Sequence, residues 1–193
     1  MTENTSTPHV TTPVPVDVAA TDVAEAGVLL NQWLGAIESV SSDLREAFRS
    51  QVNGIVDALK LVVQQKFGYQ TCVGKIVVTG DSQSYSIFFH YQIPLVSSSD
   101  RRPKADTAAK LAGIVKDPRA TTSTPPATML AVHMFIAGKA TGRTVQLQAD
   151  TPGLIKYYEK FGYTVDEGQS GVQKPTMTAT LDAMSLSNAA KSK

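Results

Sequence analysis

The chain has 193 residues, one cysteine and a formal net charge of +1, with 42% apolar and 18% charged residues. This length suits one domain with a sizeable core and is short for two. The near-neutral charge gives no reason to expect a nucleic acid or an acidic membrane as partner, and no apolar run approaches the ~18 residues of a spanning helix. The single cysteine excludes an intrachain disulfide framework, and the first residues lack the basic segment and apolar core of a secretory signal. The sequence therefore predicts a cytoplasmic protein.

The N-terminal part of the sequence predicts a flexible arm, an edge strand and a helix. Residues 1 to 13 are dominated by Thr, Ser, Pro and Asn, a composition typical of a mobile arm. A short strand is predicted at residues 14 to 18, where Pro15 confines it to a sheet edge because proline has no N–H to donate. Apolar residues at helical spacing then predict an amphipathic helix. They are Leu30, Trp33, Leu34 and Ile37.

The middle of the chain changes from helical to strand periodicity. One long apolar stripe predicts a second helix over residues 43 to 66. Residues 75 to 79 and 84 to 93 are rich in Val, Ile, Phe and Tyr and are separated by Gly-Asp-Ser-Gln, which predicts a β-hairpin. Residues 111 to 115 indicate another short strand, although residues 105 to 112 could equally begin a helix.

The C-terminal third alternates loops with regular elements. Residues 117 to 126 contain three prolines and a Thr/Ser cluster and are predicted to be a loop. Residues 127 to 137 favour a helix. A second loop is predicted at residues 168 to 175, followed by an alternating strand at 176 to 181 and a polar tail at 182 to 193.

A strand and a short helix are strongly indicated between residues 145 and 163. Apolar and polar residues alternate from 145 to 150, which is the period of a strand with one buried face. Thr151 offers a hydroxyl at a helix N-cap, and Pro152 occupies the first helical position, where no N–H is lost. Gly162 is placed to end the helix in a left-handed conformation. The apolar positions at helical spacing are Leu154, Ile155, Tyr158 and Phe161.

This strand, helix and Gly-aromatic ending resemble the C-terminal motif of the GNAT superfamily of N-acetyltransferases. The helix in that family typically ends Tyr-Glu-Lys-x-Gly-Phe or Gly-Tyr, and residues 158 to 163 read Tyr-Glu-Lys-Phe-Gly-Tyr. The resemblance implies a single GNAT-like domain over residues 14 to 181. Its fold class is α/β, with a mixed central sheet flanked by helices on both faces. It also implies transfer of an acetyl group from acetyl-CoA to an amine of a small molecule or protein.

The resemblance further implies a site for the pyrophosphate of acetyl-CoA. Enzymes of this family use an Arg/Gln-x-x-Gly-x-Gly/Ala loop, whose backbone N–H groups approach the phosphates before a helix. The equivalent stretch is residues 117 to 126, where Arg119 supplies a positive charge but no glycine occurs. Pro125 and Pro126 also remove two N–H donors. The hydroxyl donors expected to bind the cofactor there are Thr121, Thr122, Ser123 and Thr124.

A second glycine-containing stretch resembles another family pattern. Residues 138 to 143 are similar to the Gly-Lys-Gly-x-Gly-Arg word of GNAT enzymes. Only about one residue separates Arg143 from the strand that follows, which leaves no room for the helix that comes after a phosphate loop. Residues 139 to 143 are therefore predicted to form a turn into the strand.

Three residues are candidates for catalysis. Tyr158 occupies the position where the resembling enzymes carry a tyrosine that protonates the departing thiolate, but it also lies on an apolar helix face, where it could be a packed aromatic. A general base must take a proton from the amine. No glutamate lies between Glu46 and Glu159, so Asp117 or His90 would serve, although His90 could be a solvent-facing hairpin residue and His133 a half-buried helix residue. Three scattered histidines and one cysteine predict no metal site.

Two functions follow from this sequence. The first is a GNAT-type N-acetyltransferase. The alternative is a catalytically inactive GNAT-like fold that serves as an interaction or assembly module, which the glycine-free loop favours. The long stripe of the second helix could pack on another subunit, so a homo-oligomer is possible. Fold alone does not decide between them.

Overall fold

The computed structural model describes residues 13–62, 68–79, 83–95 and 107–191. The expected arm at residues 1 to 13 lies almost wholly outside these ranges, as does the end of the helix predicted to reach residue 66. The helices are α1 (Val23–Gly35), α2 (Arg45–Leu61), α3 (Pro126–Lys139), α4 (Pro152–Glu159) and α5 (Leu181–Lys191). The short 3-10 helices are η1 (Ala20–Asp22) and η2 (Ile37–Ser39).

Within the described residues, seven strands form one sheet in the order β1-β2-β3-β4-β5-β7-β6. They are β1 (Val16–Asp17), β2 (Tyr69–Thr79), β3 (Ser84–Pro94), β4 (Ala109–Lys116), β5 (Thr144–Gln148), β6 (Thr164–Val165) and β7 (Thr176–Thr180). Strands β4 and β5 are parallel, and the other neighbouring pairs in the described sheet are antiparallel. The mixed sheet predicted from the sequence is confirmed.

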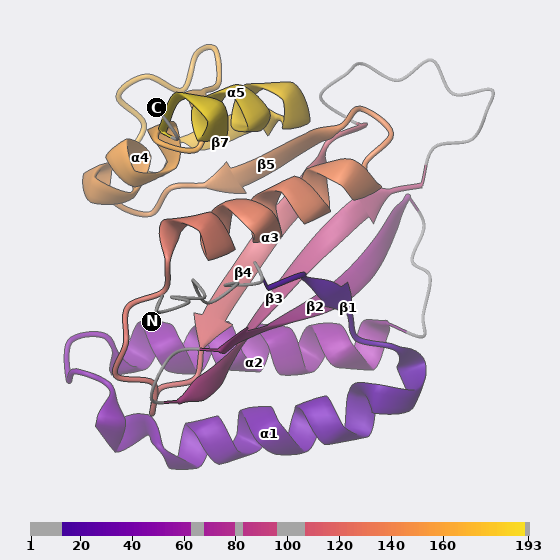
Figure 1. Ribbon diagram of the computed structural model, residues 1–193, viewed down its shortest axis with the longest axis vertical. Helices are drawn as coiled ribbons and strands as arrows, with labels where there is room; N and C mark the ends of the chain where they lie inside the picture. Colours follow the sequence, from indigo (N-terminus) through magenta and orange to yellow (C-terminus); the bar gives the residue numbers. More distant parts are fainter. Residues whose placement is uncertain (1–12, 63–67, 80–82, 96–106, 192–193) are drawn as a thin grey trace, which may run out of the picture.

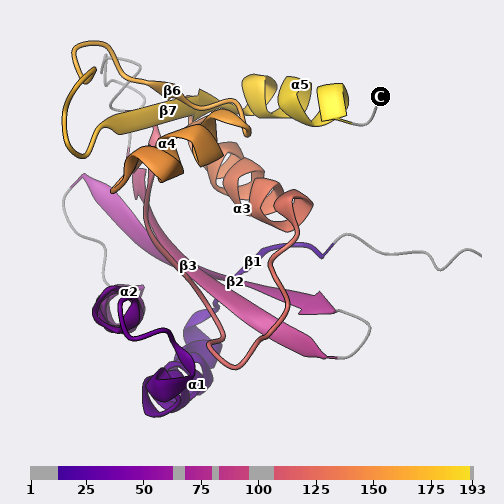
Figure 2. The ribbon, with the colours of Figure 1, turned by 90° about the vertical axis from the view of Figure 1, so that its left-hand side faces the viewer.

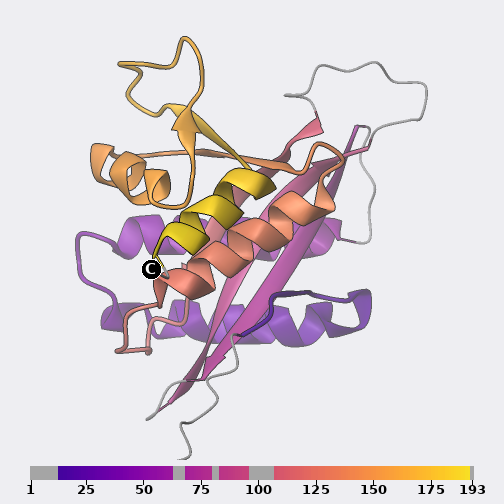
Figure 3. The same ribbon diagram turned by 45° about the horizontal axis from the view of Figure 1, so that its top comes forward.

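Helices cover both faces of the sheet (Figure 1). The helices α1 and α2 lie together on one face, and α3 lies on the other, which is clearest when the molecule is turned by a quarter (Figure 2). Helix α5 packs beside α3 (Figure 3). The expected fold class, an α/β sheet with helices on both faces, is therefore correct.

Each face of the sheet has its own apolar core. The α1–α2 face buries Trp33 against Phe88, with ring centroids 5.5 Å apart in an edge-on arrangement. The opposite face buries aliphatic side chains of β2 to β5 and β7 against α3, and it also takes in Tyr158, Phe161 and Met184. Alternate residues of one strand enter the two cores because successive side chains of a strand point to opposite faces.

Local sequence signals account for several of these elements. The hairpin of β2 and β3 is confirmed, and residues 109 to 116 form the strand β4 rather than a helix. Thr151 caps α4, because its hydroxyl oxygen accepts the Leu154 N–H at 3.3 Å. Gly162 has φ +87°, the left-handed conformation expected after that helix. The predicted turn before β5 is also present, with Arg143 at φ 49°.

Two C-terminal elements differ from the prediction. Residues 182 to 193 were expected to form a polar tail, but α5 occupies Leu181–Lys191. This helix buries Met184 completely and leaves Leu186 72% exposed, so it carries little of the apolar stripe by which a helix is recognised. The two-residue strand β6 was not predicted and is too short to show a period.

The contact between Gly74 and Phe89 gives a test of packing in this sheet. The two residues are opposite one another in the β2–β3 register. A Cβ atom at residue 74 would lie 2.2 Å from Cζ of Phe89, whose fully buried ring stacks on Tyr91 with centroids 6.0 Å apart. The ring therefore has no solvent to move into.

We expect Gly74→Ala to lower the free energy of unfolding by about 1–3 kcal/mol, since the added methyl overpacks a filled core. Denaturant unfolding measures this change. Gly27→Ala on α1 is the matched control, because a Cβ there has no neighbour within 4 Å and alanine favours a helix by up to about 1 kcal/mol. Equal stability of Gly74→Ala and the parent protein would contradict the packing described.

Candidate functional site

The two parallel strands at the centre of the sheet separate almost as soon as they pair. The β4–β5 register contains two residue pairs, Ala109 with Val145 and Lys110 with Gln146. Beyond them, β4 runs toward α2 and β5 runs toward α4 (Figure 1). The strands therefore form the two sides of a wedge that opens toward their carboxyl ends. Ligands in open α/β sheets bind in crevices at the carboxyl ends of strands.

A bulge in β4 lies at the narrow end of this wedge. His90 pairs with Gly113 and Tyr91 pairs with Leu111, which leaves Ala112 as the extra residue. The Asp117 backbone N–H donates to the Ser86 carbonyl oxygen of β3 at 3.0 Å. Backbone N–H and C=O groups point to the same side at every second residue of a strand. The groups of Gly113 therefore point toward β3, as those of Asp117 do, and the groups of Ile114 point toward the wedge.

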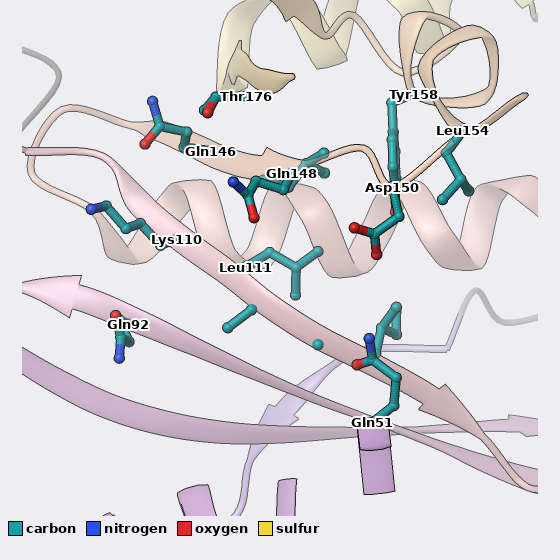
Figure 4. Close-up of a pocket in the computed structure, with 14 residues that line it drawn as sticks. Gln51, Gln92, Lys110, Leu111, Gln146, Gln148, Asp150, Leu154, Tyr158 and Thr176 are labelled. Carbon is teal, nitrogen blue, oxygen red and sulfur yellow. The ribbon is translucent and has the colours of Figure 1, made fainter. Parts of the chain in front are cut away.

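The wedge contains a cavity of about 610 Å³. Its walls come from β3, β4, β5, the start of β7, α4 and one residue of α2 (Figure 4). More than half of the residues that line the cavity have polar side chains. Its polar side chains are Gln51, Gln92, Lys110, Gln146, Gln148, Asp150, Tyr158 and Thr176.

Tyr158 connects this cavity to the core behind it. The side chain is 9% exposed, and its ring extends from α4 toward the cavity (Figure 4). Burial raises the pKa of the phenol to about 12, and the neighbouring Tyr157 and Asp150 add to this effect. The hydroxyl therefore keeps its proton at neutral pH and can act as an acid. Tyr158 is thus a packed aromatic residue, and its side chain also lines the cavity.

An aromatic cluster supports Tyr158 from behind. His133 lies at ring-centroid distances of 5.8 Å from Tyr158, 5.8 Å from Phe161 and 5.4 Å from Tyr163. His133 Nδ1 and the Tyr163 hydroxyl are 2.9 Å apart, and Nε2 has no partner among the described residues. The imidazole is fully buried rather than half-buried as expected, and this burial lowers its pKa to about 4.

Asp150 contributes the one carboxylate among the described residues that line this cavity. It follows β5 on the same side as Gln146 and Gln148 and comes directly before the N-cap of α4. Its Oδ1 is 3.1 Å from Lys174 Nζ in an exposed ion pair. Asp150 is not one of the predicted bases, although the alternation from residue 145 to 150 places it on the polar face of that strand.

His90 lies beneath the wall of the cavity rather than in its lining. A Cβ atom on Gly113 would be 2.5 Å from His90 Nε2 and 2.5 Å from Gln51 Oε1, so both side chains converge on this part of β4. The ring is half-buried under α2, where a Cβ atom on Gly54 would be 3.6 Å from Nε2. Burial lowers the pKa of His90, so the imidazole is neutral at pH 7 and able to accept a proton.

Asp117 and Arg119 bind one another outside the cavity. Arg119 Nε donates to Asp117 Oδ1 at 2.9 Å, and Nη2 donates to Oδ2 at 2.7 Å. Burial raises the pKa of Asp117, but the hydrogen bonds and charge of Arg119 outweigh it and hold the pKa below its ordinary value. Both oxygens of the predicted base therefore accept hydrogen bonds from Arg119.

The other residues predicted to bind the cofactor lie in the loop between β4 and α3. Thr121, Thr122 and Ser123 are exposed and Thr124 is half-buried, so their hydroxyls are accessible. Lys116 Nζ donates to the carbonyl oxygen of Thr122 at 2.8 Å. The residues expected to bind phosphate are therefore together, but both cations near them already have acceptors.

The first turn of α3 offers few backbone donors. Pro126 has no N–H, and the Pro125 carbonyl oxygen accepts the N–H of Thr128 at 3.0 Å and that of Met129 at 3.3 Å. A phosphate at this helix N-terminus would have fewer N–H groups than a glycine-rich loop supplies. The loop thus fits an anion only in part, through hydroxyls and through whatever charge Arg119 retains.

The described residues contain neither a cluster of metal ligands nor a membrane-spanning helix. Within the described ranges, no three His, Cys, Asp or Glu side chains are placed to hold a metal ion. In the same part of the chain, no helix combines the length and apolar character needed to cross a lipid bilayer.

Comparison with known proteins gives one similar structure to report. No family model matches the sequence, and no curated protein matches it. The crystal structure of the PaiA N-acetyltransferase from Thermoplasma acidophilum in complex with coenzyme A superposes with a TM-score of 0.44 and 12% sequence identity. The match covers 88% of this chain and 99% of the other. A similarity of this size does not bear on the activity of this chain.

The buried His133 predicts a dependence of stability on pH. In the unfolded chain the imidazole takes up a proton near pH 6.5, whereas in the folded protein it does so only near pH 4. The unfolded state binds more protons between these values, so stability present above pH 6.5 is lost as the pH falls toward 4. The loss amounts to at most about 3 kcal/mol.

We expect His133→Phe to flatten this pH dependence, because phenylalanine keeps a ring and does not titrate. Unfolding by denaturant at pH 7, 5.5 and 4 measures it. His90, whose pKa is also lowered, remains in both proteins, so the difference between their curves isolates His133. Parallel curves for the two proteins would show that His133 is not buried in a neutral form.

Proposed function

We propose that this protein is an N-acyltransferase that moves an acetyl group from acetyl-CoA to an amine. One observation carries the proposal. The separation of β4 and β5 after Lys110 brings the free edge of a bulged strand and a nearly buried phenol to opposite sides of one cavity. Direct transfer from a thioester to an amine needs a donor for the developing oxyanion and an acid for the leaving thiolate.

The Ile114 N–H and Tyr158 match these two needs. The amine nitrogen forms a bond to the thioester carbonyl carbon, and the carbonyl oxygen accepts the Ile114 N–H that faces the wedge. The carbon–sulfur bond then breaks, and the thiolate takes the proton of the Tyr158 hydroxyl. The raised pKa of Tyr158 ensures that this proton is present at neutral pH.

The amine must also lose a proton. We propose Asp150, which lines the cavity, or His90, which lies behind Gly113, as the group that accepts it. Asp117 is a weaker candidate because Arg119 occupies its carboxylate. Asp150→Asn and His90→Gln, each compared with the parent protein in acyl transfer, distinguish the two groups.

The diphosphate of acetyl-CoA would lie against the loop that precedes α3. We propose the hydroxyls of residues 121 to 124 and the Arg119 guanidinium as its partners. The phosphate must compete with Asp117 for Arg119, so binding is expected to be weaker than at a glycine-rich loop. Small-molecule and protein amines both remain candidate acceptors.

The second candidate function is a non-catalytic interaction or assembly module. The observation that favours it is the closed Asp117–Arg119 pair in a loop without glycine. In this case the wedge would have no catalytic role, and acetyl-CoA would not bind. A homo-oligomer is compatible with either function.

We expect acetyl-CoA to raise the melting temperature of the protein, because a ligand that binds only the folded state stabilises it. Arg119→Ala should weaken binding by about 1.5–3 kcal/mol through loss of a charge-assisted hydrogen bond. Asp117→Asn should bind at least as tightly as the parent, since it releases Arg119. Calorimetric titration measures both affinities.

Arg49→Ala serves as the control for loss of one positive charge, because Arg49 is exposed on α2 and pairs with Glu46. If the intact protein shows no binding at millimolar acetyl-CoA, the non-catalytic interaction or assembly module becomes the better-supported hypothesis. Equal affinities of Arg119→Ala and Arg49→Ala would remove the proposed phosphate site.

Tyr158→Phe tests the chemistry itself. The change keeps the ring and deletes the proton, so we expect turnover to fall by about 10²–10⁴-fold and stability to change by at most about 1 kcal/mol. Tyr157→Phe is the matched control, because Tyr157 is the half-buried neighbour that does not line the cavity. Acyl transfer and melting temperature are measured on both variants. Full activity in Tyr158→Phe would reduce Tyr158 to a packing residue.

A further inference from the structure

The cavity has opposite charges at its two ends. Lys110 lies at the end where β4 and β5 are still paired, and Asp150 lies at the open end, below Tyr158 (Figure 4). Gln146 and Gln148 lie between them on the same side of β5. A ligand that fills this cavity therefore meets a cation, then amides, then a carboxylate.

The ammonium of Lys110 is available to an anion. The side chain is exposed, and Nζ lies 5.3 Å from the centroid of the Tyr69 ring. No ion pair of Lys110 with a carboxylate occurs within the ranges that the structure describes. A cation–π contact at an exposed site is worth only about 0.5–1 kcal/mol and does not neutralise the charge. A carboxylate could add to this contact without displacing it.

Asp150 can exchange its partner. Its ion pair with Lys174 joins side chains that are 54% and 58% exposed. Exposed pairs of this kind contribute about 0–1 kcal/mol, so a substrate ammonium can take the place of Lys174 at small cost. Asp150 is also close enough to Tyr158 to raise the pKa of its phenol. An amine held by Asp150 is therefore near the proposed acid.

The side chains between the charged ends can form hydrogen bonds with the amide groups of a ligand. Gln146 Nε2 donates to Asp166 Oδ2 at 2.9 Å and to Thr178 Oγ1 at 3.3 Å, which fixes the amide and presents its carbonyl oxygen as an acceptor. Lys110 is level with Gln146, and Asp150 follows four residues later. At about 3.3 Å per residue, the two residues are roughly 13 Å apart along the strand, and the Lys110 side chain extends away from Asp150 (Figure 4). An extended chain of three residues spans about 10 Å, and an ion pair at each end adds about 3 Å more.

We propose that the acyl acceptor is a short peptide-like zwitterion, with its amine at Asp150 and its carboxylate at Lys110. This assignment rests on the proposed acyltransferase function, because it names the substrate of the same cavity. The substrate ammonium first loses one proton to solvent. The amine nitrogen then bonds to the acetyl carbon and loses a second proton to Asp150, the carbon–sulfur bond breaks, and Tyr158 gives its proton to the thiolate. The proton on Asp150 returns to the Tyr158 phenolate through solvent. The product is an N-acetyl peptide that keeps its carboxylate on Lys110.

Triglycine and triglycinamide test the role of the carboxylate, since they differ at that group alone. With acetyl-CoA and the full chain, we expect kcat/KM to be about tenfold or more higher for triglycine, and the dissociation constant to favour triglycine by a similar ratio. Lys110→Gln should bring both ratios to about one, and Lys110→Arg should retain them. Lys60→Gln, which removes a lysine on α2 that pairs with Asp57, is the control and should keep the parent ratios.

The two measurements separate this assignment from the proposed function. Acetylation of both peptides without preference, or a preference that survives Lys110→Gln, would overturn the zwitterion site and leave the acyltransferase standing. Binding of triglycine that depends on Lys110, in a protein that neither binds acetyl-CoA nor transfers acetyl groups, would support the peptide site and refute the enzyme. Equal dissociation constants for the two peptides would overturn the site whatever the activity.

Discussion

Backbone hydrogen bonding between β4 and β5 ends after two residue pairs, and the remaining features of the cavity depend on that separation. If β4 and β5 stayed paired as far as Ile114, the Ile114 N–H would donate to β5, and no space would remain between the strands. Because the strands diverge, the polar face of β5 remains open where α2 no longer covers the sheet. The bulge at Ala112 bends β4 at the same level.

Packing behind the cavity determines the protonation state of Tyr158. The phenol of Tyr158 is part of an aromatic cluster that includes a neutral histidine, and the exclusion of water from this cluster keeps the pKa of the phenol high. The same burial therefore stabilises α4 against α3 and keeps the proton in place. The loop before α3 shows the opposite arrangement, in which an exposed arginine is neutralised by its own neighbour Asp117.

The sequence predicts the elements whose causes are local and misses what depends on pairing between distant segments. Thr151, Pro152 and Gly162 determine the limits of α4 by their own chemistry, so that helix was predictable. Its neighbour α5 buries Met184 but has no continuous apolar stripe, so this helix was not predictable. The cavity could not be foreseen, because the placement of Lys110 and Asp150 in one space follows from the β4–β5 register and its early end.

Gly162 limits how this part of the chain can change by substitution. Its φ of +87° excludes most side chains, and a Cβ atom there would lie 2.9 Å from the carbonyl oxygen of Ala183 in α5. Asparagine tolerates the backbone conformation but not the lack of space, and alanine tolerates neither. No other residue can therefore replace Gly162 without a shift of α5. Position 162 is thus constrained by the packing of α5 as well as by the end of α4.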